Sequence, residues 1–385
     1  MTGRRLLLVN AHGADEFAGG AEGYVAGLAD GFAARGYDVQ ILAAYPSDAR
    51  GRPVKTLYSK HWRESRARWL LNHAGAFAAL PTRTLRAAVA HAAPDLMHTN
   101  NLPGMWTGIW EAARCERVPV VHTIHDYQLL CARVTLLRSD GTPCRPHPLA
   151  CGLRQKRLAR WAGAVSDVIG VSHHVLDRHR DFFPEARRTK IGVPPVPAAH
   201  TRRPPGERLA TLGYLGALEH TKGIRPLLDA AAALAEVGCT LVIGGDGRLR
   251  ADVEAAAGAA SNVVYAGPVA GADKDAFLEQ CDAGILPSVW EEPGGPTLVA
   301  LEWLAASRPL LLSPRGGLRE ALGEVSGAIA VEPTSAAIAD AVARLADAAE
   351  WRRAVTAVRP PETRTLDSWL DEHQRVYEEA VAGAG

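Results

Sequence analysis

Two histidines and an aspartate that could do chemistry stand close together in the segment VVHTIHD, residues 120–126. The segment begins as an apolar, β-branched run, which predicts a buried strand that ends near His125. A histidine at a strand end can hydrogen-bond a substrate hydroxyl, and a neighbouring carboxylate can orient the ring or bind a sugar. His122, His125 and Asp126 are therefore candidate ligand-binding residues. The alternative for each histidine is a ring satisfied inside the core.

Glycine-rich turns follow other apolar runs. Gly19 and Gly20 lie in AGGAEG, where a strand gives way to a helix, and Gly245 lies in LVIGGDG. Glycine lets the backbone approach a phosphate closely, and a helix N-terminus favours an anion. Lys222 precedes a helical segment in HTKGIRPLL and suits a diphosphate. Simple tight turns and a solvated lysine are the alternatives.

The segment WEEPGGPTLVALE, residues 290–302, places acidic residues on both sides of a Gly/Pro-rich turn. Glu291 and Glu292 precede the turn, and an apolar stretch leads from Thr297 to Glu302. Such a segment either holds a ligand or only joins a strand to a helix. Another glycine turn follows in SPRGGLRE, residues 313–320.

The elements that would position these residues form two α/β domains. Runs that are apolar throughout alternate with Ala/Leu-rich segments, which indicates parallel sheets covered on both faces. A proline-rich segment without periodicity, residues 192–207, predicts a linker. We predict two doubly wound, Rossmann-like domains facing across a cleft, residues 1–195 and 205–364, with a final helix at about 365–385 that packs back on the first domain. The predicted strands are residues 4–12, 38–45, 96–100, 118–126, 166–174, 209–216, 240–246, 262–267, 283–288, 309–314 and 328–333.

The strand-end segments occur in a recognisable order: GGAE, DLMHTN, HTIHD, SDVIGVS, GYLG with KG, IGGDG, PSVWEE with LVALE, and RGGLRE. In this order they resemble the retaining glycosyltransferases of family 4, the glycosyl transferases group 1, which have the GT-B fold. The resemblance covers nearly the whole chain. It implies an enzyme whose second domain holds a nucleotide-sugar and whose first domain holds the acceptor. That acceptor is a small molecule, a lipid-linked intermediate or a polysaccharide with a reactive hydroxyl.

The resemblance also implies roles for individual residues. His125 contacts the transferred sugar, Lys222 binds the diphosphate, and Glu292, favoured over Glu291, bonds sugar hydroxyls; these are the expected catalytic residues. Glu302 accepts hydrogen bonds from the ribose hydroxyls, and the helix that begins near Thr297 offers backbone N–H groups to the diphosphate. His122 and Asp126 are expected on the acceptor side. The expected donor-binding residues are Gly19, Gly20, Gly216, Lys222, Gly245, Thr297, Leu298 and Glu302.

One departure from the family pattern concerns a cation. The family often has an arginine directly after the glycine that matches Gly216, but here Ala217 occupies that position. One positive partner of the leaving diphosphate is therefore missing, and His220 and Arg225 are candidates to replace it. Weak activity or an unusual donor would follow if neither does.

The second departure concerns the glutamates. The family places two of them eight positions apart, but position 294, eight before Glu302, is a glycine. Glu291 and Glu292 lie eleven and ten positions before Glu302. The GGP sequence therefore lengthens the loop, which must deliver its carboxylate along a different path.

The mechanism implied by the resemblance keeps the chemistry on one face of the sugar. The leaving diphosphate helps to remove the acceptor proton, and the protein positions the reactants and stabilises the leaving charge. Lys222 and helix dipoles supply that stabilisation, so no metal and no cofactor is expected besides a UDP-, GDP- or dTDP-sugar co-substrate. A nucleotide-sugar epimerase or phosphorylase and a degenerate, non-catalytic nucleotide-sugar binder are the alternatives.

Four residues after HTIHD have a spacing that resembles a metal site. Cys131, Cys144, His147 and Cys151 form C-x12-C-x2-H-x3-C, and thiolate with imidazole ligands suits tetrahedral zinc. The first gap is long, however, and no CxxC is present. A loop of reduced thiols is the favoured interpretation, and zinc is the alternative.

Composition limits the partners and the location. Forty-three Lys and Arg nearly balance forty-two Asp and Glu, so no global field favours nucleic acid. No apolar run reaches the roughly 18 residues of a membrane span, and the N-terminal run is too short for a signal peptide. A cytoplasmic protein is therefore expected. The basic segment 55–77 could touch an anionic membrane, but a solvated helix face with its tryptophans packed inward is favoured.

Overall fold

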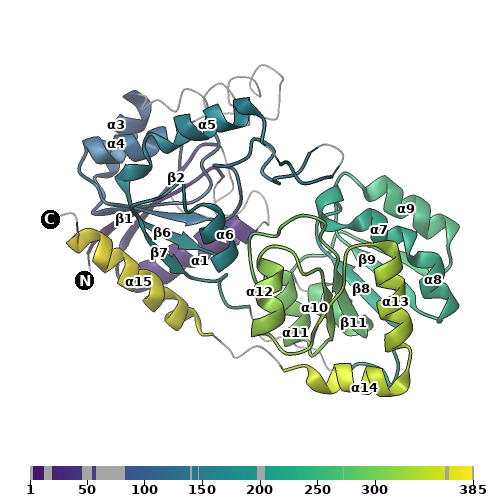
Figure 1. Cartoon of the computed structure of the whole chain (residues 1–385). Helices are drawn as coiled ribbons and strands as arrows, with labels where there is room; N and C mark the ends of the chain where they lie inside the picture. Colours follow the sequence, from purple (N-terminus) through teal and green to yellow (C-terminus); the bar gives the residue numbers. More distant parts are fainter. Residues whose placement is uncertain are drawn as a thin grey trace. The chain divides into compact units, whose positions relative to one another are not determined.

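The computed structural model describes residues 3–12, 20–45, 54–57, 83–138, 141–145, 147–196, 204–271, 273–359 and 364–383. Their packing divides the chain into two compact units. Unit 1 contains residues 1–136, 144–194 and 365–385, and unit 2 contains residues 137–143 and 195–364. The division at residue 194 lies inside the segment predicted as a linker, of which residues 197–203 lie outside the described part. Each unit is a parallel sheet covered by helices (Figure 1).

The sheet of unit 1 has the strand order β3-β2-β1-β4-β5-β6-β7. Its central strands are buried along nearly their whole length, as their uninterrupted apolar runs predict. The chain moves outward from β1 to β3 and then restarts on the other side of β1 with β4. The carboxyl ends of β1 and β4 therefore form a topological switch point, where such sheets bind ligands. The strands are β1 Arg5–Asn10, β2 Asp38–Ala43, β3 Val54–Thr56, β4 Leu96–Thr99, β5 Val120–Ile124, β6 Val165–Gly170 and β7 Arg187–Lys190.

Helices cover both faces of this sheet. The helices α3, α4 and α5 lie on one face, and α1 and α15 lie together on the other (Figure 1). The helix predicted at the C-terminus is α15, which belongs to unit 1. The helices of unit 1 are α1 Gly20–Ala34, α3 Arg83–Ala92, α4 Gly108–Cys115, α5 Leu149–Ala159, the 3-10 turn η2 Ala162–Ala164, α6 His173–Arg178 and α15 Leu366–Ala382.

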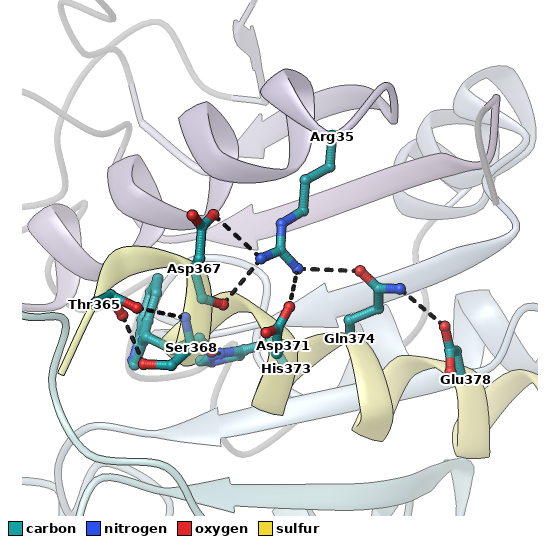
Figure 2. Close-up of polar contacts among 9 residues, drawn as sticks. Arg35, Thr365, Asp367, Ser368, Asp371, His373, Gln374 and Glu378 are labelled. Atoms are coloured by element: carbon teal, nitrogen blue, oxygen red, sulfur yellow. Dashed lines mark hydrogen bonds and ion pairs between the residues drawn. The ribbon is translucent and has the colours of Figure 1, made fainter.

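Close packing and charge hold α15 against α1. A Cβ atom at Gly31 would lie 2.4 Å from the side chain of Leu370, so the glycine makes room for the second helix. Arg35, directly after α1, donates to the Asp367 carbonyl at 2.9 Å and pairs with Asp371 at 2.8 Å (Figure 2). The same guanidinium reaches Gln374 at 3.1 Å. The C-terminal helix is thus an integral part of unit 1.

The sheet of unit 2 has the order β10-β9-β8-β11-β12-β13, and every described pairing is parallel. Its order reverses between β8 and β11, which creates a second switch point. All six strands fall in segments predicted as strands. They are β8 Thr211–Leu215, β9 Thr240–Gly244, β10 Val263–Gly267, β11 Ala283–Leu286, β12 Leu310–Leu312 and β13 Ala328–Ala330.

Alternate residues of these strands face two separate cores. Leu241 and Ile243 of β9 pack with α7, α8, α9, α13 and α14, whereas Val242 between them packs with α10, α11 and α12. The unit is therefore a three-layer sandwich. Its helical elements are the 3-10 turn η3 His220–Lys222, α7 Ile224–Asp229, α8 Ala231–Glu236, α9 Arg250–Ala259, α10 Asp273–Gln280, α11 Leu298–Ala305, α12 Gly317–Glu324, α13 Ser335–Leu345 and α14 Ala348–Ala357.

The packing of Trp303 against the sheet makes a stability prediction. The indole is fully buried, and a Cβ atom at Gly284 of β11 would lie 2.4 Å from it. We expect Gly284→Ala to lower the free energy of unfolding by about 1–3 kcal/mol through overpacking. Gly258→Ala on α9 is the matched control, because its Cβ meets no atom within 4 Å and alanine favours a helix. Urea denaturation measures both, and an unchanged Gly284→Ala midpoint would contradict the packing.

Candidate functional site

Two loops of unit 2 meet at the switch point between β8 and β11. The amide of Val289, after β11, donates to the carbonyl of Thr221, after β8, at 2.9 Å. Gly223 has φ of +77°, and a Cβ there would lie 1.8 Å from the carbonyl oxygen of Pro287. Only glycine permits this approach, so the two loops are fixed against each other.

A charged pair lies where these loops join. The Lys222 ammonium donates to both carboxylate oxygens of Glu292, at 2.7 and 3.0 Å. Ser288 donates to the same carboxylate at 2.5 Å, and the ammonium lies 5.1 Å from the centre of the Trp290 ring. The Lys222 side chain is 30% exposed, whereas that of Glu292 is 6% exposed. The lysine can therefore turn toward a ligand without unfolding the loop.

The lengthened glutamate loop folds back on the second glycine turn. The amide of Gly317 donates to the carbonyl of Glu292 at 2.6 Å. Gly316 has φ of +60°, and a Cβ atom there would lie 2.4 Å from the same carbonyl. A Cβ at Gly295 would in turn lie 1.9 Å from the Gly317 carbonyl. The RGG turn thus supports the loop that carries Glu292, a role that its sequence did not indicate.

Gly216 and Gly245, two of the predicted donor-binding glycines, lie side by side at the ends of β8 and β9. A Cβ atom at Gly245, where φ is +137°, would lie 1.9 Å from the carbonyl of Gly216. Next to them the carbonyl of Ala217 accepts from the Tyr214 hydroxyl at 2.7 Å. Arg225, a candidate replacement for the missing cation, pairs instead with Asp252 at 3.0 Å.

The helix α11 begins where the sequence predicts. Its N-cap is Thr297, whose hydroxyl accepts from the Ala300 amide at 3.3 Å, and Leu298 is its first residue. One turn further, an oxygen of Glu302 accepts from the Lys274 ammonium at 2.8 Å. The other oxygen, Oε2, is buried and has no hydrogen-bond partner in the described part of the chain. A buried carboxylate oxygen without a partner is costly unless a ligand supplies a donor.

In unit 1, His125 lies beside the switch point between β1 and β4. Its Nε2 lies 2.9 Å from Oδ1 of Asn100, which follows β4, so this nitrogen carries the proton and Nδ1 is the acceptor. The Tyr24 ring packs against it in a T-shaped arrangement with ring centres 4.8 Å apart. Burial lowers the pKa of His125 to about 3. The ring is therefore neutral at physiological pH and can accept a hydrogen bond from a hydroxyl.

Asp126 is part of a second group of charges near this histidine. Its carboxylate accepts from the Gln128 amide at 2.7 Å. Its pKa is raised to about 6, mainly by burial and to a smaller extent by the nearby Glu22 carboxylate, while the Gln128 amide and Arg154 act in the opposite direction. Burial also raises the pKa of Glu22, in the first turn of α1. Sequence reasoning missed Glu22, although it is the glutamate of the AGGAEG turn.

His122 lies in the core instead. Its ring is 1% exposed, its Nδ1 lies 2.9 Å from the Thr99 hydroxyl, and it packs against Trp110. Burial holds the pKa of His122 well below its usual value. The structure thus separates His122 from Asp126 and favours the alternative of a satisfied core histidine. Of the two predicted glycines of the first loop, Gly20 begins α1 and is exposed, and Gly19 lies outside the described residues.

The three cysteines of the predicted loop are close enough to influence one another. Burial raises the pKa of the Cys151 thiol, and Cys131 and Cys144 raise it further. His147 is exposed. Within the described ranges, no three His, Cys, Asp or Glu side chains are arranged to hold a metal ion, and these four residues are all among them. Cys131, Cys144 and Cys151 are free thiols, and Cys151 lies on α5.

Two family models match the chain, one in each unit. The model described as Glycosyltransferase Family 4 matches residues 18–195, and the model described as Glycosyl transferases group 1 matches residues 210–348. The chain belongs to this family of glycosyltransferases. A curated relative in it is the 2-deoxystreptamine glucosyltransferase of Streptomyces kanamyceticus, which is 30% identical over 253 residues. The match covers 61% of this chain and 63% of that relative's length.

Solved structures share the fold over the full chain. Sucrose-phosphate synthase from Thermosynechococcus elongatus superposes with a TM-score of 0.68 at 18% identity, covering 99% of this chain and 100% of that one. The Anabaena protein HepE, in complex with UDP and glucose, gives 0.64 at 16% identity, covering 97% of this chain and 99% of that one. This chain therefore has the two-domain, Rossmann-like GT-B fold predicted from its sequence.

Proposed function

We propose that this chain is a retaining glycosyltransferase that transfers a sugar from a nucleotide-sugar to an acceptor hydroxyl. The observation that carries the proposal is the buried Oε2 of Glu302, which has no partner in the described part of unit 2. A ribose hydroxyl supplies the donor that this oxygen lacks. The complex of the Anabaena relative with UDP and glucose supports a nucleotide-sugar donor.

The diphosphate is bound by Lys222 and by α11 in this proposal. Lys222 is partly exposed at the switch point, and the N-terminus of α11 favours an anion. When the diphosphate binds, the lysine exchanges the Glu292 carboxylate for phosphate oxygens. Glu292 then turns its acceptor oxygens to the hydroxyls of the donor sugar. The same exchange of partners therefore binds both the diphosphate and the sugar of the donor, and it requires no metal ion.

The reaction breaks the bond between C1 of the sugar and the diphosphate oxygen. The acceptor oxygen bonds to C1 on the same face of the ring, and its proton passes to the leaving phosphate. Lys222 stabilises the charge that develops there. His125 is neutral, and its Nδ1 accepts a hydrogen bond from a hydroxyl of the transferred sugar. Asp126 serves the acceptor side in this proposal, whereas His122, which is buried, takes no part in it.

Donor hydrolysis tests the proposed activity. Purified protein is incubated with UDP-, GDP- and dTDP-sugars, with and without EDTA, and nucleotide release is measured. We expect slow hydrolysis of one donor class at a rate unchanged by EDTA, and formation of an α-glycoside from an α-linked donor once an acceptor is found. Binding of a donor without hydrolysis or transfer over a broad acceptor panel would instead support a non-catalytic binder, an alternative consistent with Ala217.

Glu302 gives the sharpest binding prediction. We expect Glu302→Ala to weaken binding of the corresponding nucleoside diphosphate by about tenfold or more, because it removes hydrogen bonds to a charged acceptor. Calorimetry with the 2′,3′-dideoxy analogue isolates the ribose contribution. Wild-type protein should prefer the ribose form, and the variant should bind both forms equally. Glu254→Gln, an exposed carboxylate on α9, is the control. A variant that keeps the ribose preference would exclude this role for Glu302.

A further inference from the structure

The helix α5 presents an unusual surface outside the sites described above. Leu149 is 94% exposed and Leu153 is 51% exposed, the two highest values among the large apolar side chains of the described residues. Both belong to the same helix, one turn apart. Large apolar side chains that gather on one exposed face indicate an interaction surface, whereas scattered ones do not.

Cations continue the same face toward the end of the helix. At about 100° per residue, Leu149, Leu153, Lys156, Arg157 and Arg160 fall within an arc of about 100°. The opposite face carries Leu158 and Arg154, which are both buried. The exposed face is therefore apolar at its start and cationic at its end, while the other face anchors the helix to unit 1. We call Leu149, Leu153, Lys156, Arg157 and Arg160 the α5 face.

The charge of this region is strongly one-sided, although the whole chain is nearly neutral. Residues 141–166 contain five Lys and Arg and no Asp or Glu. Neither Lys156 nor Arg157 has a carboxylate partner in the described part of unit 1. Arg160 lies over the Trp161 ring and within electrostatic range of Glu111, whose carboxylate is already paired with Arg114 at 2.6 Å. The α5 face thus keeps its positive charge for an external partner.

We propose that the α5 face binds the surface of an anionic lipid bilayer. Exposed leucines beside lysine and arginine are the features of a helix that lies in the membrane interface, where leucine enters the acyl region and the cations meet headgroups. Charge complementarity favours lipid over a second copy of the chain, because two α5 faces would bring like charges together. None of the described helices is long and apolar enough to cross a bilayer. The inference is independent of the proposed donor and reaction.

Vesicle sedimentation tests this surface without any activity measurement. The full chain is mixed with vesicles of phosphatidylglycerol and phosphatidylcholine in equal parts, or of phosphatidylcholine alone. We expect binding to the anionic vesicles only. Raising the salt from about 0.05 to about 0.5 M shortens the electrostatic screening length severalfold, so binding should weaken. Lys156→Glu/Arg157→Glu should lower the partition coefficient by about tenfold or more, and Leu149→Ser/Leu153→Ser should lower it severalfold.

Matched controls place the same changes elsewhere. Arg352→Glu/Arg353→Glu reverses two exposed charges on α14, and Leu366→Ser removes another exposed leucine on α15. These variants should bind anionic vesicles as the wild type does. The proposal is overturned if wild-type protein ignores anionic vesicles at low salt, or if the α5 and control variants bind alike. It is also overturned if light scattering shows self-association that the leucine substitutions abolish, since the α5 face would then be a protein interface.

Discussion

Replacing Lys222 by methionine lowers the rate of sugar transfer at saturating donor by about 10²–10³-fold, the loss expected when one preorganised stabiliser of a leaving charge is removed. Methionine keeps most of the apolar stem that lies near Trp290 but carries no charge. The measurement is single-turnover transfer, or donor hydrolysis, with the donor that the wild type cleaves. Arg225→Met is the matched control, because Arg225 is a nearby cation whose partner, Asp252, lies on α9. Its rate should stay within about twofold.

Stability must be separated from chemistry in this experiment. Lys222→Met leaves the nearly buried Glu292 carboxylate without its cation, which is destabilising by itself. The double variant Lys222→Met/Glu292→Gln removes that charge, and the Ser288 hydroxyl can still bond the amide. We expect it to regain thermal stability without regaining activity. A double variant that recovers the wild-type rate would show that Lys222 acts only by neutralising Glu292.

Most of the fold was predictable because its strands are buried on both faces. Every strand of unit 2 and the strands β1, β2, β4, β5 and β6 of unit 1 coincide with apolar runs of the sequence. The two strands that the sequence did not predict are β3 and β7, which form the edges of the unit 1 sheet. The strand β7 has the sequence RRTK and exposed residues, so it gives no apolar signal. The positions of the switch points also depend on strand order, which alternation of strands and helices does not determine.

The candidate site shows where spacing is informative and where it is not. His122 lies on β5 and His125 follows directly after its end at Ile124; in an extended chain, side chains three residues apart point to opposite faces. That argument was available from the sequence and separates the core histidine from its neighbour. The path of the loop with Glu292 was not available, because it depends on contacts with Gly316 and Gly317 more than twenty residues later. Glu22 and Asn100 likewise join the site only through the fold.

Asp126 gives the second prediction with a large effect, and it concerns pH. Its pKa rises from 3.8 to about 6 on folding, mainly through burial. Between these values the unfolded chain has released the proton that the folded chain keeps, so stability falls as pH rises through this window. The shift of about two units corresponds to about 3 kcal/mol at most above pH 7. We expect Asp126→Asn to be more stable than the wild type at pH 7.5 by up to this amount, and nearly equal to it near pH 4.

The geometry explains why this substitution can be stabilising and still impair function. Asparagine retains an oxygen to accept from the Gln128 amide, but it does not repel Glu22. Asp347→Asn is a control in which the stability change has the opposite sign. Backbone amides of Glu350 and Ala349 lower the pKa of the Asp347 carboxyl, so its charge stabilises the fold at neutral pH and its loss should be destabilising there. Urea denaturation from pH 4 to 8 measures both. A stability difference for Asp126→Asn that is constant over this range would exclude a raised pKa. If the variant is more stable at pH 7.5 and transfers sugar more slowly, the cost of the buried charge is linked to the acceptor role, as for other functional carboxylates held in unfavourable surroundings.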